Sequence, residues 1–286
     1  MKKKYSILIS ILFLCLISKT YGVDFSLKLS GGLSVINPTN INQILKNWEK
    51  WYKGYCEQNS NFSFIEGEIT SLKKAIDLEG ELLFTFHPRI AVSIGAGLIF
   101  SELNPEKIRI TIKNITTNNN RDNTYPQKVT AFPIILSGYY LHPLSSKIKL
   151  YAKGSTGLIW AKYVGRKANK ESSQDNYNYI FYQNAKTKGP LLAGSLGLMV
   201  ETNPGINFFF EGSFRKANLD SFKEKDELGA HGTLYFFEEY STSAELWYSK
   251  FQIMEQEPSG ENYRSVKTAE INLSGFSVKL GIIINF

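Results

Sequence analysis

The sequence of 286 residues is poor in the residue types on which much protein chemistry depends. Two cysteines cannot support a framework of disulfides, and three histidines leave little material for a metal cage. After the N-terminal region no run of 18 apolar residues occurs, which excludes a polytopic helical membrane protein. With 43% hydrophobic and 21% charged residues, the chain can still bury a sizeable core and is not a disordered charged tail.

Residues 1–22 have the pattern of a cleaved secretory signal peptide. Three lysines precede an apolar stretch at 5–17, and Thr20 and Gly22 are the small residues of a cleavage site. Cleavage removes four lysines and no acid, so the formal net charge falls from +7 to +3 and nucleic-acid binding loses its support. We expect a signal peptide at 1–22 and one mature domain at 23–286. Cys56 is then the single cysteine, and whether it is a buried thiol or forms an intermolecular disulfide stays open.

Alternating apolar and polar residues, typical of a β-strand with one apolar face, recur through the mature chain. The first segment sets Leu27 and Leu29 against Ser26 and Lys28. Eight segments have this pattern: 24–36, 76–86, 90–100, 132–140, 150–160, 192–200, 206–214 and 276–286.

Short and long connections alternate between these segments. The short ones are 87–89, 142–147 and 203–205, with Pro, Gly or Ser as turn residues. The long, polar ones are 37–71, 102–127, 164–187 and 217–267. All long connections therefore leave one end of the sheet. This segregation is typical of transmembrane β-barrels with short periplasmic turns and long extracellular loops, and a soluble eight-stranded barrel has no reason for it.

The two faces of the predicted strands differ in size as well as polarity. In each segment one set of alternate residues, which we call one parity, consists of large aliphatic and aromatic residues. The other parity mixes Gly, Ala and Ser with charged residues. Small residues suit a narrow lumen and large apolar residues suit lipid, so we predict that the apolar face points outward. Aromatic residues near strand ends are candidates for the girdles at the membrane interfaces: Phe84, Phe86, Tyr139, Tyr140, Trp160, Tyr163 and Phe286.

The signal peptide, the alternation and the last strand resemble bacterial outer-membrane β-barrel proteins of the OmpA transmembrane-domain, OmpX and opacity-protein type. In that group a terminal strand ending in Phe is read by the barrel-assembly machinery, and the resemblance covers residues 23–286. It implies an all-β, eight-stranded antiparallel up-and-down transmembrane barrel in the outer membrane. It also assigns the assembly signal to these residues: Phe276, Leu280, Ile282, Ile284 and Phe286.

Two features depart from that pattern. Ile271 and Leu273 lie on the opposite parity from Phe276, which calls for a bulge near 274–275. The long connection at 217–267 contains two extended segments, 232–237 and 244–253. We interpret them as an extracellular hairpin that prolongs the barrel wall, and the alternative is a barrel of ten strands.

Charged residues on the inward parity predict a network inside the barrel. An eight-stranded barrel is barely wide enough for its own side chains, so charges held there must be paired. A salt-bridged plug is favoured, and the alternative is a gated or leaky pore. The predicted lumen residues are Lys28, Asp77, Glu79, Glu81, Lys149, Lys153, Glu211, Arg215 and Lys279, with Glu201 on the same parity.

Catalytic motifs are missing from the sequence: there is no GxSxG, HExxH, CxxC or phosphate-binding glycine loop. Some barrels of this type modify lipid A with a Ser, often helped by His and an acid. The corresponding set here is His231 with Glu238, Glu239, Ser241 or Ser243, and we favour an ordinary loop histidine. No catalytic residue, metal site or cofactor is predicted.

The first long connection contains aromatic residues at helical spacing. Trp48, Trp51, Tyr52 and Tyr55 lie within 41–55, interleaved with lysines and Glu49. This predicts a short amphipathic helix on the rim or outer leaflet, and the alternative is a self-packed loop.

The sequence as a whole predicts a non-enzymatic outer-membrane barrel with a structural or surface-interaction role. A small porin-like channel and a lipid A-modifying enzyme are the alternatives. The expected partners are outer-membrane lipids and lipopolysaccharide, with the assembly machinery during biogenesis and no nucleic acid, and a monomer is expected. The ligand, and the role of the loop aromatics Trp48, Trp51 and Tyr55, cannot be read from the sequence.

Overall fold

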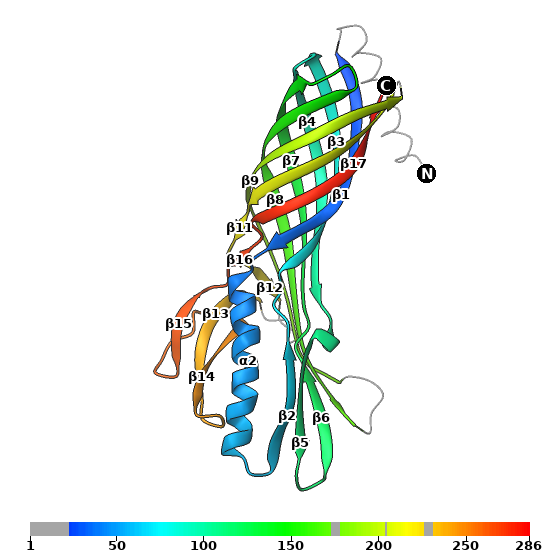
Figure 1. The fold of residues 1–286 in the computed structure, drawn as a ribbon. Coiled ribbons are helices and arrows are strands. Elements are labelled where there is room, and N and C mark those ends of the chain that lie inside the picture. Colours follow the sequence, from blue (N-terminus) through cyan, green and yellow to red (C-terminus); the bar gives the residue numbers. More distant parts are fainter. Residues whose placement is uncertain (1–22, 173–177, 204, 226–230) are drawn as a thin grey trace, which may run out of the picture.

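The computed structural model describes residues 23–172, 178–203, 205–225 and 231–286, so the predicted signal peptide lies outside the described residues. Eight antiparallel strands form a closed ring in the order β1-β3-β4-β7-β8-β9-β10-β17, and β17 pairs with β1 (Figure 1). The ring therefore has eight strands rather than ten. Its strands are β1 (Asp24–Ile36), β3 (Lys74–His87), β4 (Ile90–Leu103), β7 (Gln127–Pro143), β8 (Ile148–Glu171), β9 (Asn178–Asn203), β10 (Ile206–Lys216) and β17 (Gly275–Asn285).

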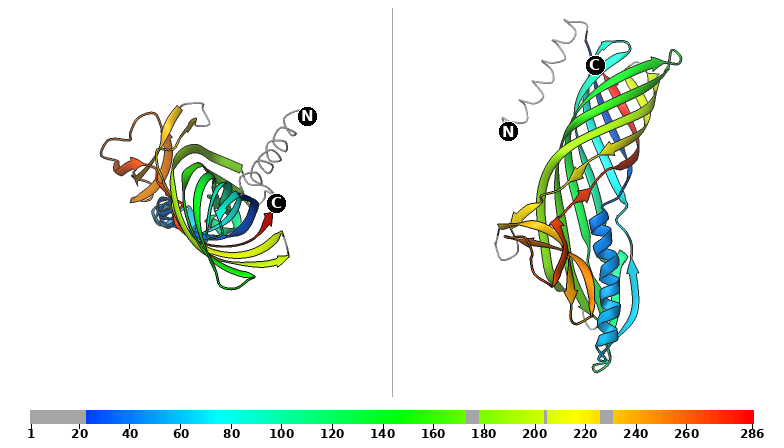
Figure 2. Two further views of the ribbon diagram at one scale, coloured as in Figure 1. Left: turned by 90° about the horizontal axis from the view of Figure 1, so that it is seen from above. Right: turned by 90° about the vertical axis from the view of Figure 1, so that its left-hand side faces the viewer.

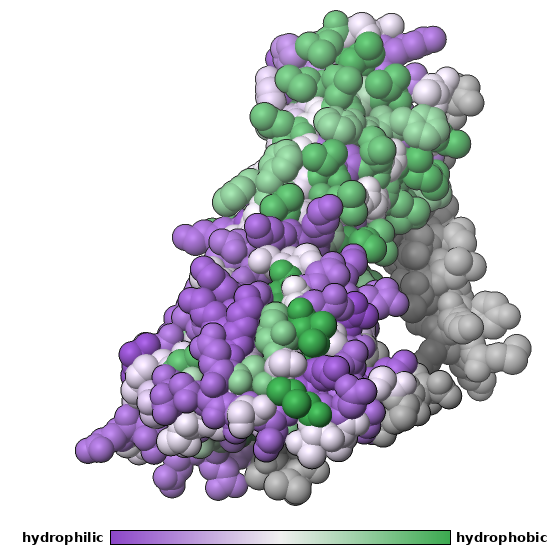
Figure 3. Space-filling view, turned by 60° about the horizontal axis from the view of Figure 1, so that its bottom comes forward, coloured by the Kyte–Doolittle hydropathy of each residue, from purple (hydrophilic) through white to green (hydrophobic). Residues whose placement is uncertain are grey.

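The outside of the ring is apolar and its inside is polar. Outward side chains such as Leu33, Leu196 and Leu280 are 68%, 66% and 63% exposed, whereas the inward Lys28 and Glu211 are 1% and 0% exposed. In the space-filling view the apolar residues gather over the barrel and the polar residues over the other half of the molecule (Figure 3). The predicted orientation of the two strand faces is confirmed.

The two ends of the barrel differ. Tight links follow β3, β7 and β9, and the C-terminus lies at this end, which we call the turn end (Figure 1). The long connections build a second structure at the opposite end, which we call the head. Its elements, joined by the far ends of β8 and β9, are α2 (Thr39–Gln58), β2 (Phe62–Ile69), η1 (Pro105–Lys107), β5 (Ile108–Asn114), β6 (Asn119–Thr124), β11 (Asn218–Leu219), β12 (Lys223–Lys225), β13 (His231–Ser241), β14 (Leu246–Met254), β15 (Tyr263–Thr268) and β16 (Ile271–Asn272).

The wall of the head is a curved sheet that α2 completes. Its strands follow the order β14-β13-β12-β9-β8-β6-β5-β2, and α2 contacts both end strands, β14 and β2 (Figures 1 and 2). The predicted helix is thus confirmed and is longer than 41–55, but it lies on the seam of the head rather than on a lipid surface. In the part of the chain that the structure describes, no helix is long and apolar enough to cross a membrane.

An apolar core fills the head. Trp48 and Tyr52 of α2 pack with rings 5.3 Å apart, and Trp48 also contacts Tyr125. The β5 residues Ile108 and Ile110 are fully buried in the same core. Burial raises the pKa of Tyr125 to about 12 and also raises the pKa of Tyr52, so both phenols stay neutral at physiological pH. The amphipathic pattern of α2 therefore serves packing, which is what stabilises most helices.

The structure decides the two open questions about the last long connection, the extended segments and the bulge before the last strand. Segments 231–241 and 246–254 form a hairpin, β13–β14, that belongs to the head and not to the ring. Ile271 and Leu273 are fully buried in the head core, and the strand is interrupted before β17 begins at Gly275, instead of carrying a bulge. Cys56 is a free, partly buried thiol beside the same core, and burial raises its pKa.

Candidate functional site: the charged lumen of the barrel

The lumen holds charged side chains because alternate residues of a strand share one face. β3 contributes Asp77, Glu79 and Glu81, whose spacing of two residues directs all three carboxylates inward. Strands β1, β8, β10 and β17 supply the cations from other sides of the ring. The charges of the network are Lys28, Asp77, Glu79, Glu81, Lys153, Glu211, Arg215 and Lys279.

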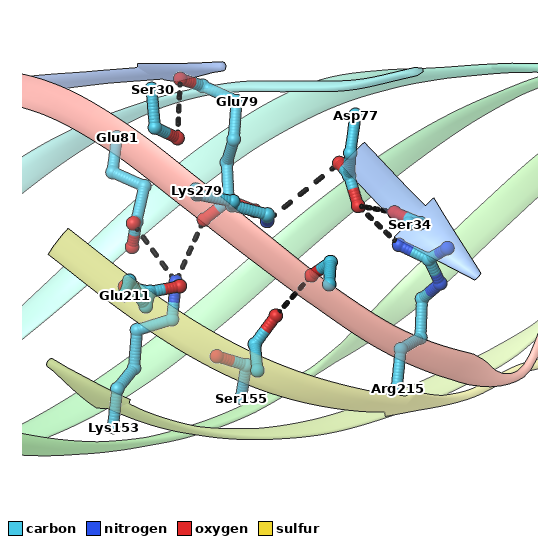
Figure 4. A network of polar contacts seen from close by, with 12 residues as sticks. Ser30, Ser34, Asp77, Glu79, Glu81, Lys153, Ser155, Glu211, Arg215 and Lys279 are labelled. Carbon is cyan, nitrogen blue, oxygen red and sulfur yellow. Dashed lines mark hydrogen bonds and ion pairs between the residues drawn. The ribbon is translucent and has the colours of Figure 1, made fainter. Parts of the chain in front are cut away.

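Two lysines and three glutamates form the part of the network nearer the turn end. Lys28 Nζ lies 2.6 Å from Glu211 Oε2 and 3.0 Å from Glu81 Oε1. Lys153 Nζ lies 2.7 Å from Glu79 Oε1 and 3.0 Å from Glu81 Oε1 (Figure 4). Lys28 thus bridges two carboxylates, and Lys153 contacts a third, Glu211, at 3.7 Å; both lysines are almost completely buried.

The other part of the network lies toward the head. Lys279 Nζ is 2.6 Å from Glu79 Oε2 and 3.6 Å from Asp77 Oδ1, which joins the two parts (Figure 4). Arg215 Nη1 donates to Asp77 Oδ2 at 2.7 Å, and Ser34 Oγ donates to the same oxygen at 3.0 Å. The network contains four cations and four carboxylates, so its formal charge is zero. Pairing of this kind offsets the large cost of taking charges out of water.

Aromatic rings close the network on the turn side. Tyr139 donates its hydroxyl to Glu81 at 2.7 Å, and Tyr151 donates to Glu211 at 2.8 Å. Lys28 Nζ lies 4.6 Å from the centre of the Phe209 ring. These rings belong to an apolar layer that we call the floor, consisting of Leu83, Ala91, Tyr139, Leu141, Tyr151, Met199, Phe209 and Ile283.

The distribution of polarity decides what kind of barrel this is. The ring is closed, its outer face is a belt of exposed Leu, Ile and Phe, and its charges are paired inside. A closed barrel leaves no unpaired strand edge for lipid, and an apolar exterior is what a bilayer requires. The tight turns lie at one end and the large connections at the other.

The molecule is a transmembrane β-barrel of the outer-membrane type. No protein-family model and no curated protein matches the chain. Among solved structures it is similar to the outer membrane protein OprG from Pseudomonas aeruginosa, at 12% identity and a TM-score of 0.43, over 92% of this chain and 95% of that one.

Two further solved structures are similar over 92% of this chain and 99% of their own. One is Ail, the attachment invasion locus protein of Yersinia pestis, at 8% identity and a TM-score of 0.36. The other is a major outer membrane protein from Thermus thermophilus, at 10% identity and a TM-score of 0.38.

The structure brings eight of the nine predicted lumen residues into one network, and Lys149 lies outside it. Lys149 is half-buried near the turn at 144–147 and makes no ion pair among the described residues. Glu201 is also half-buried, close to the turn after β9. Both residues have the inward parity, but they lie where the lumen opens to water, so hydration replaces pairing.

Two aromatic residues predicted for the interfacial girdles are inside the molecule instead. Tyr139 is 4% exposed and part of the floor, and Tyr163 is buried in the head core. Tyr139 and Tyr151 complete the network and were not predicted to do so. The signal was available, because both share the inward parity of their strands with Ser137 and Lys153.

The candidate catalytic set of the last connection is not assembled. His231 begins β13 and Ser241 ends it, so about ten residues of strand, or roughly 33 Å, separate them. Glu238 pairs with Arg264 at 2.7 Å, and Glu239 pairs with Lys250. In the described part of the chain no group of three or more His, Cys, Asp or Glu could hold a metal ion.

The C-terminal strand presents its predicted residues on one side. Phe276 and Leu280 are 52% and 63% exposed on the outer face of β17, and Phe286, just after the strand, packs against Phe25 at 5.4 Å between ring centres. Ile282 and Ile284 share this parity. Their role as an assembly signal stays a prediction.

Proposed function

We propose that the protein is a closed, non-enzymatic barrel whose task is to anchor the head at the cell surface, where the head makes contacts with other molecules. The observation that carries the proposal is that side chains fill the interior of the molecule along the whole barrel axis. From the turn end, the inward strand faces pass from the apolar floor to the charged network, between whose two parts lie hydrogen-bonded serines such as Ser137 and Ser155. The apolar core of the head follows.

The filled lumen argues against the channel alternative. The network is neutral and its members are bonded to one another, so an ion would have to break several buried ion pairs to pass. Beyond the network it would meet the buried Ile159 and Tyr163 of the head core. Neither layer provides the hydrated path that conduction needs.

Planar-bilayer recording tests the closed barrel. The reconstituted wild-type protein is expected to give the conductance of a protein-free bilayer. Insertion is verified on the same sample by the gel mobility of unboiled protein. Conductance steps whose ion selectivity changes in Lys153→Gln, but not in the exposed-residue control Lys46→Gln, would establish a pore through the network and overturn the proposal.

The face of the head formed by β13, β14 and β15 supports the surface-interaction part. Tyr240 and Trp247 pack with ring centres 5.5 Å apart, and the Arg264 guanidinium lies 4.4 Å from the centre of the Trp247 ring. Half-exposed aromatic residues and arginines are the residue types that dominate protein interfaces.

Cell adherence tests this part of the proposal. Cells that display the wild-type protein are expected to adhere to cultured cell monolayers or to one another more strongly than cells that display a Tyr240→Ser, Trp247→Ser, Arg264→Ser triple variant. A variant of the opposite head face, Ile115→Ser and Lys113→Ser, is the matched control. Equal adherence of all three proteins at equal surface display would contradict an interaction role for this face.

A further inference from the structure

The outer edge of the apolar belt on the head side is marked by lysines. On β8 and β10 the last large outward residues are Trp160 and Phe214, which are 40% and 59% exposed. Two residues further along each strand, on the same outward parity, lie Lys162 and Lys216.

The same step occurs on β3, β7 and β9, where a lysine follows the last large outward residue after two or four positions. We call these five residues the lysine collar: Lys74, Lys128, Lys162, Lys188 and Lys216.

The opposite edge of the belt has no such collar among the described residues. The outward residues there are mostly aromatic or aliphatic, including Phe86, Ile90, Tyr140 and Ile206, each at least 41% exposed. The collar is therefore a property of the head side alone and not a general consequence of where strands leave the membrane. Lysines at such a boundary lay their aliphatic stems along apolar surface and raise the ammonium groups into the headgroup region.

A groove lies within the collar between β7 and β8. Its volume is about 420 Å³, and its lining includes Lys128, Lys162, Arg166, Thr130 and Glu102. Thr130 is directly opposite Lys162, and Lys128 is opposite Val164, so the two lysines are diagonal neighbours, about 7–8 Å apart at the backbone. Lysine side chains are long enough for both ammonium groups to reach one phosphate from this spacing.

The charges of the groove favour an anion. One carboxylate, Glu102, contacts Lys128 at 3.6 Å between half-exposed groups, which is a weak pair. Arg166 stacks over Tyr182, with 5.3 Å between the guanidinium and the ring centre. The two lysines Lys128 and Lys162 against the one carboxylate Glu102 in the lining give the groove a net positive charge immediately beside the hydrocarbon belt.

We propose that the lysine collar binds the phosphate groups of a phosphorylated lipid of the outer leaflet, with the groove between Lys128 and Lys162 as its principal position. Lysine binds phosphate as a compact point charge, and a lipid that lies against the belt brings its phosphates to the height of the collar. The proposal rests on the orientation of the barrel in the bilayer and not on the filled lumen, so a conducting barrel would still carry this site.

The test uses the full mature protein in nanodiscs of neutral phosphatidylcholine. Lipid A, which carries phosphates, and its dephosphorylated form are added as probes, and binding is measured by native mass spectrometry. A Lys128→Gln, Lys162→Gln, Lys188→Gln, Lys216→Gln variant is compared with a control of equal charge change in the head, Lys46→Gln, Lys53→Gln, Lys107→Gln, Lys223→Gln. Every lysine in the two sets is exposed or half-exposed, and folding is verified by gel mobility.

The collar variant is expected to bind lipid A at least about tenfold more weakly than wild type, while the head variant binds it within about twofold of wild type. Dephosphorylated lipid A is expected to bind all three proteins equally weakly. Lys162→Arg is expected to retain binding where Lys162→Gln reduces it.

Three outcomes would overturn the proposal. The first is equal binding of lipid A to the wild-type protein and the collar variant. The second is an equal loss of lipid A binding in the collar variant and the head variant, which would mean that binding depends only on the overall charge of the protein. The third is full displacement of lipid A by inorganic phosphate at millimolar concentration, which would indicate a site for a free anion instead of a lipid.

Discussion

At the scale of single residues, the lumen shows how pairing makes a charged interior possible. Lys28 is the most enclosed cation of the network, because it contacts two carboxylates and lies among three aromatic rings. Its partners Glu81 and Glu211 are equally buried. Removing one member of such a set leaves its partners as uncompensated charges in a site that water cannot reach.

We therefore predict that Lys28→Met lowers the free energy of unfolding by about 3–5 kcal/mol. The exposed pair of Arg264 with Glu238 provides the comparison, and Arg264→Met is expected to cost at most about 1 kcal/mol. Urea titration in phosphatidylcholine vesicles, with the folded fraction read from the mobility of unboiled protein, measures both. Similar small losses in the two variants would mean that the network is hydrated.

Gly197 is required by the ring of Tyr151. A Cβ atom at this position would fall inside van der Waals contact with the ring and its hydroxyl, and the hydroxyl is held by its hydrogen bond to Glu211. We predict that Gly197→Ala lowers the free energy of unfolding by about 1–3 kcal/mol. Gly194, on the same strand, has nothing within 4 Å of the place that a Cβ atom would take, so Gly194→Ala is the control and is expected to have little effect in the same titration. Equal effects would show that the ring can move aside.

At the scale of elements, α2 is the piece that makes the head a closed body. The sheet of the head ends in two strand edges, β14 and β2, and the helix covers the seam between them. Trp48 projects from it into the core at 6% exposure and contacts both Tyr52 and Tyr125. A helix is an effective cover here because its buried face needs no partner for its backbone hydrogen bonds.

Trp48→Ala is expected to destabilise the head by about 3–5 kcal/mol while the barrel stays folded. Hydrogen exchange followed by mass spectrometry should report faster exchange in α2 and β5 and unchanged exchange in β1 and β17. Trp247→Ala, which removes a half-exposed ring of the same kind, is the control and should leave the exchange of α2 near that of the wild type. Unchanged protection of α2 in Trp48→Ala would mean that the seam does not depend on this residue.

At the scale of the whole molecule, the two ends of the barrel face different compartments. The tip of the β5–β6 hairpin is far from the turns that follow β3, β7 and β9 (Figure 1). In an outer-membrane barrel the tight turns are periplasmic and the large connections extracellular. We therefore predict that the head and the lysine collar face the outside of the cell.

Cysteine labelling in intact cells measures this orientation. In a Cys56→Ser background, Thr117→Cys at the tip of the β5–β6 hairpin is expected to react with a membrane-impermeant maleimide. Lys147→Cys in a tight turn is expected to react only after the outer membrane is permeabilised. The reverse pattern would place the head in the periplasm and remove the basis for a surface role.

The alternation of residues by itself predicted the barrel and most of the residues that face the lumen, and the closed ring of the structure decided for eight strands over ten. A period of two is a local property of a strand, and large apolar residues such as Leu33 and Leu280 can only be tolerated outward in lipid. The same parity marks Tyr139 as an inward residue, which its position near a strand end obscured.

Only the tertiary structure decided how the long connections fold and which inward charges meet. The sheet of the head joins β6 to β8 and β12 to β9 across large distances in sequence, and no local pattern specifies such pairings. The alternation places Lys149 and Lys153 on the same, inward face of β8. Their positions along the barrel axis differ, however, so Lys149 lies near water and Lys153 contacts three carboxylates. The pairing of a charge depends on its neighbours around the closed ring, and closure is a property of the whole molecule.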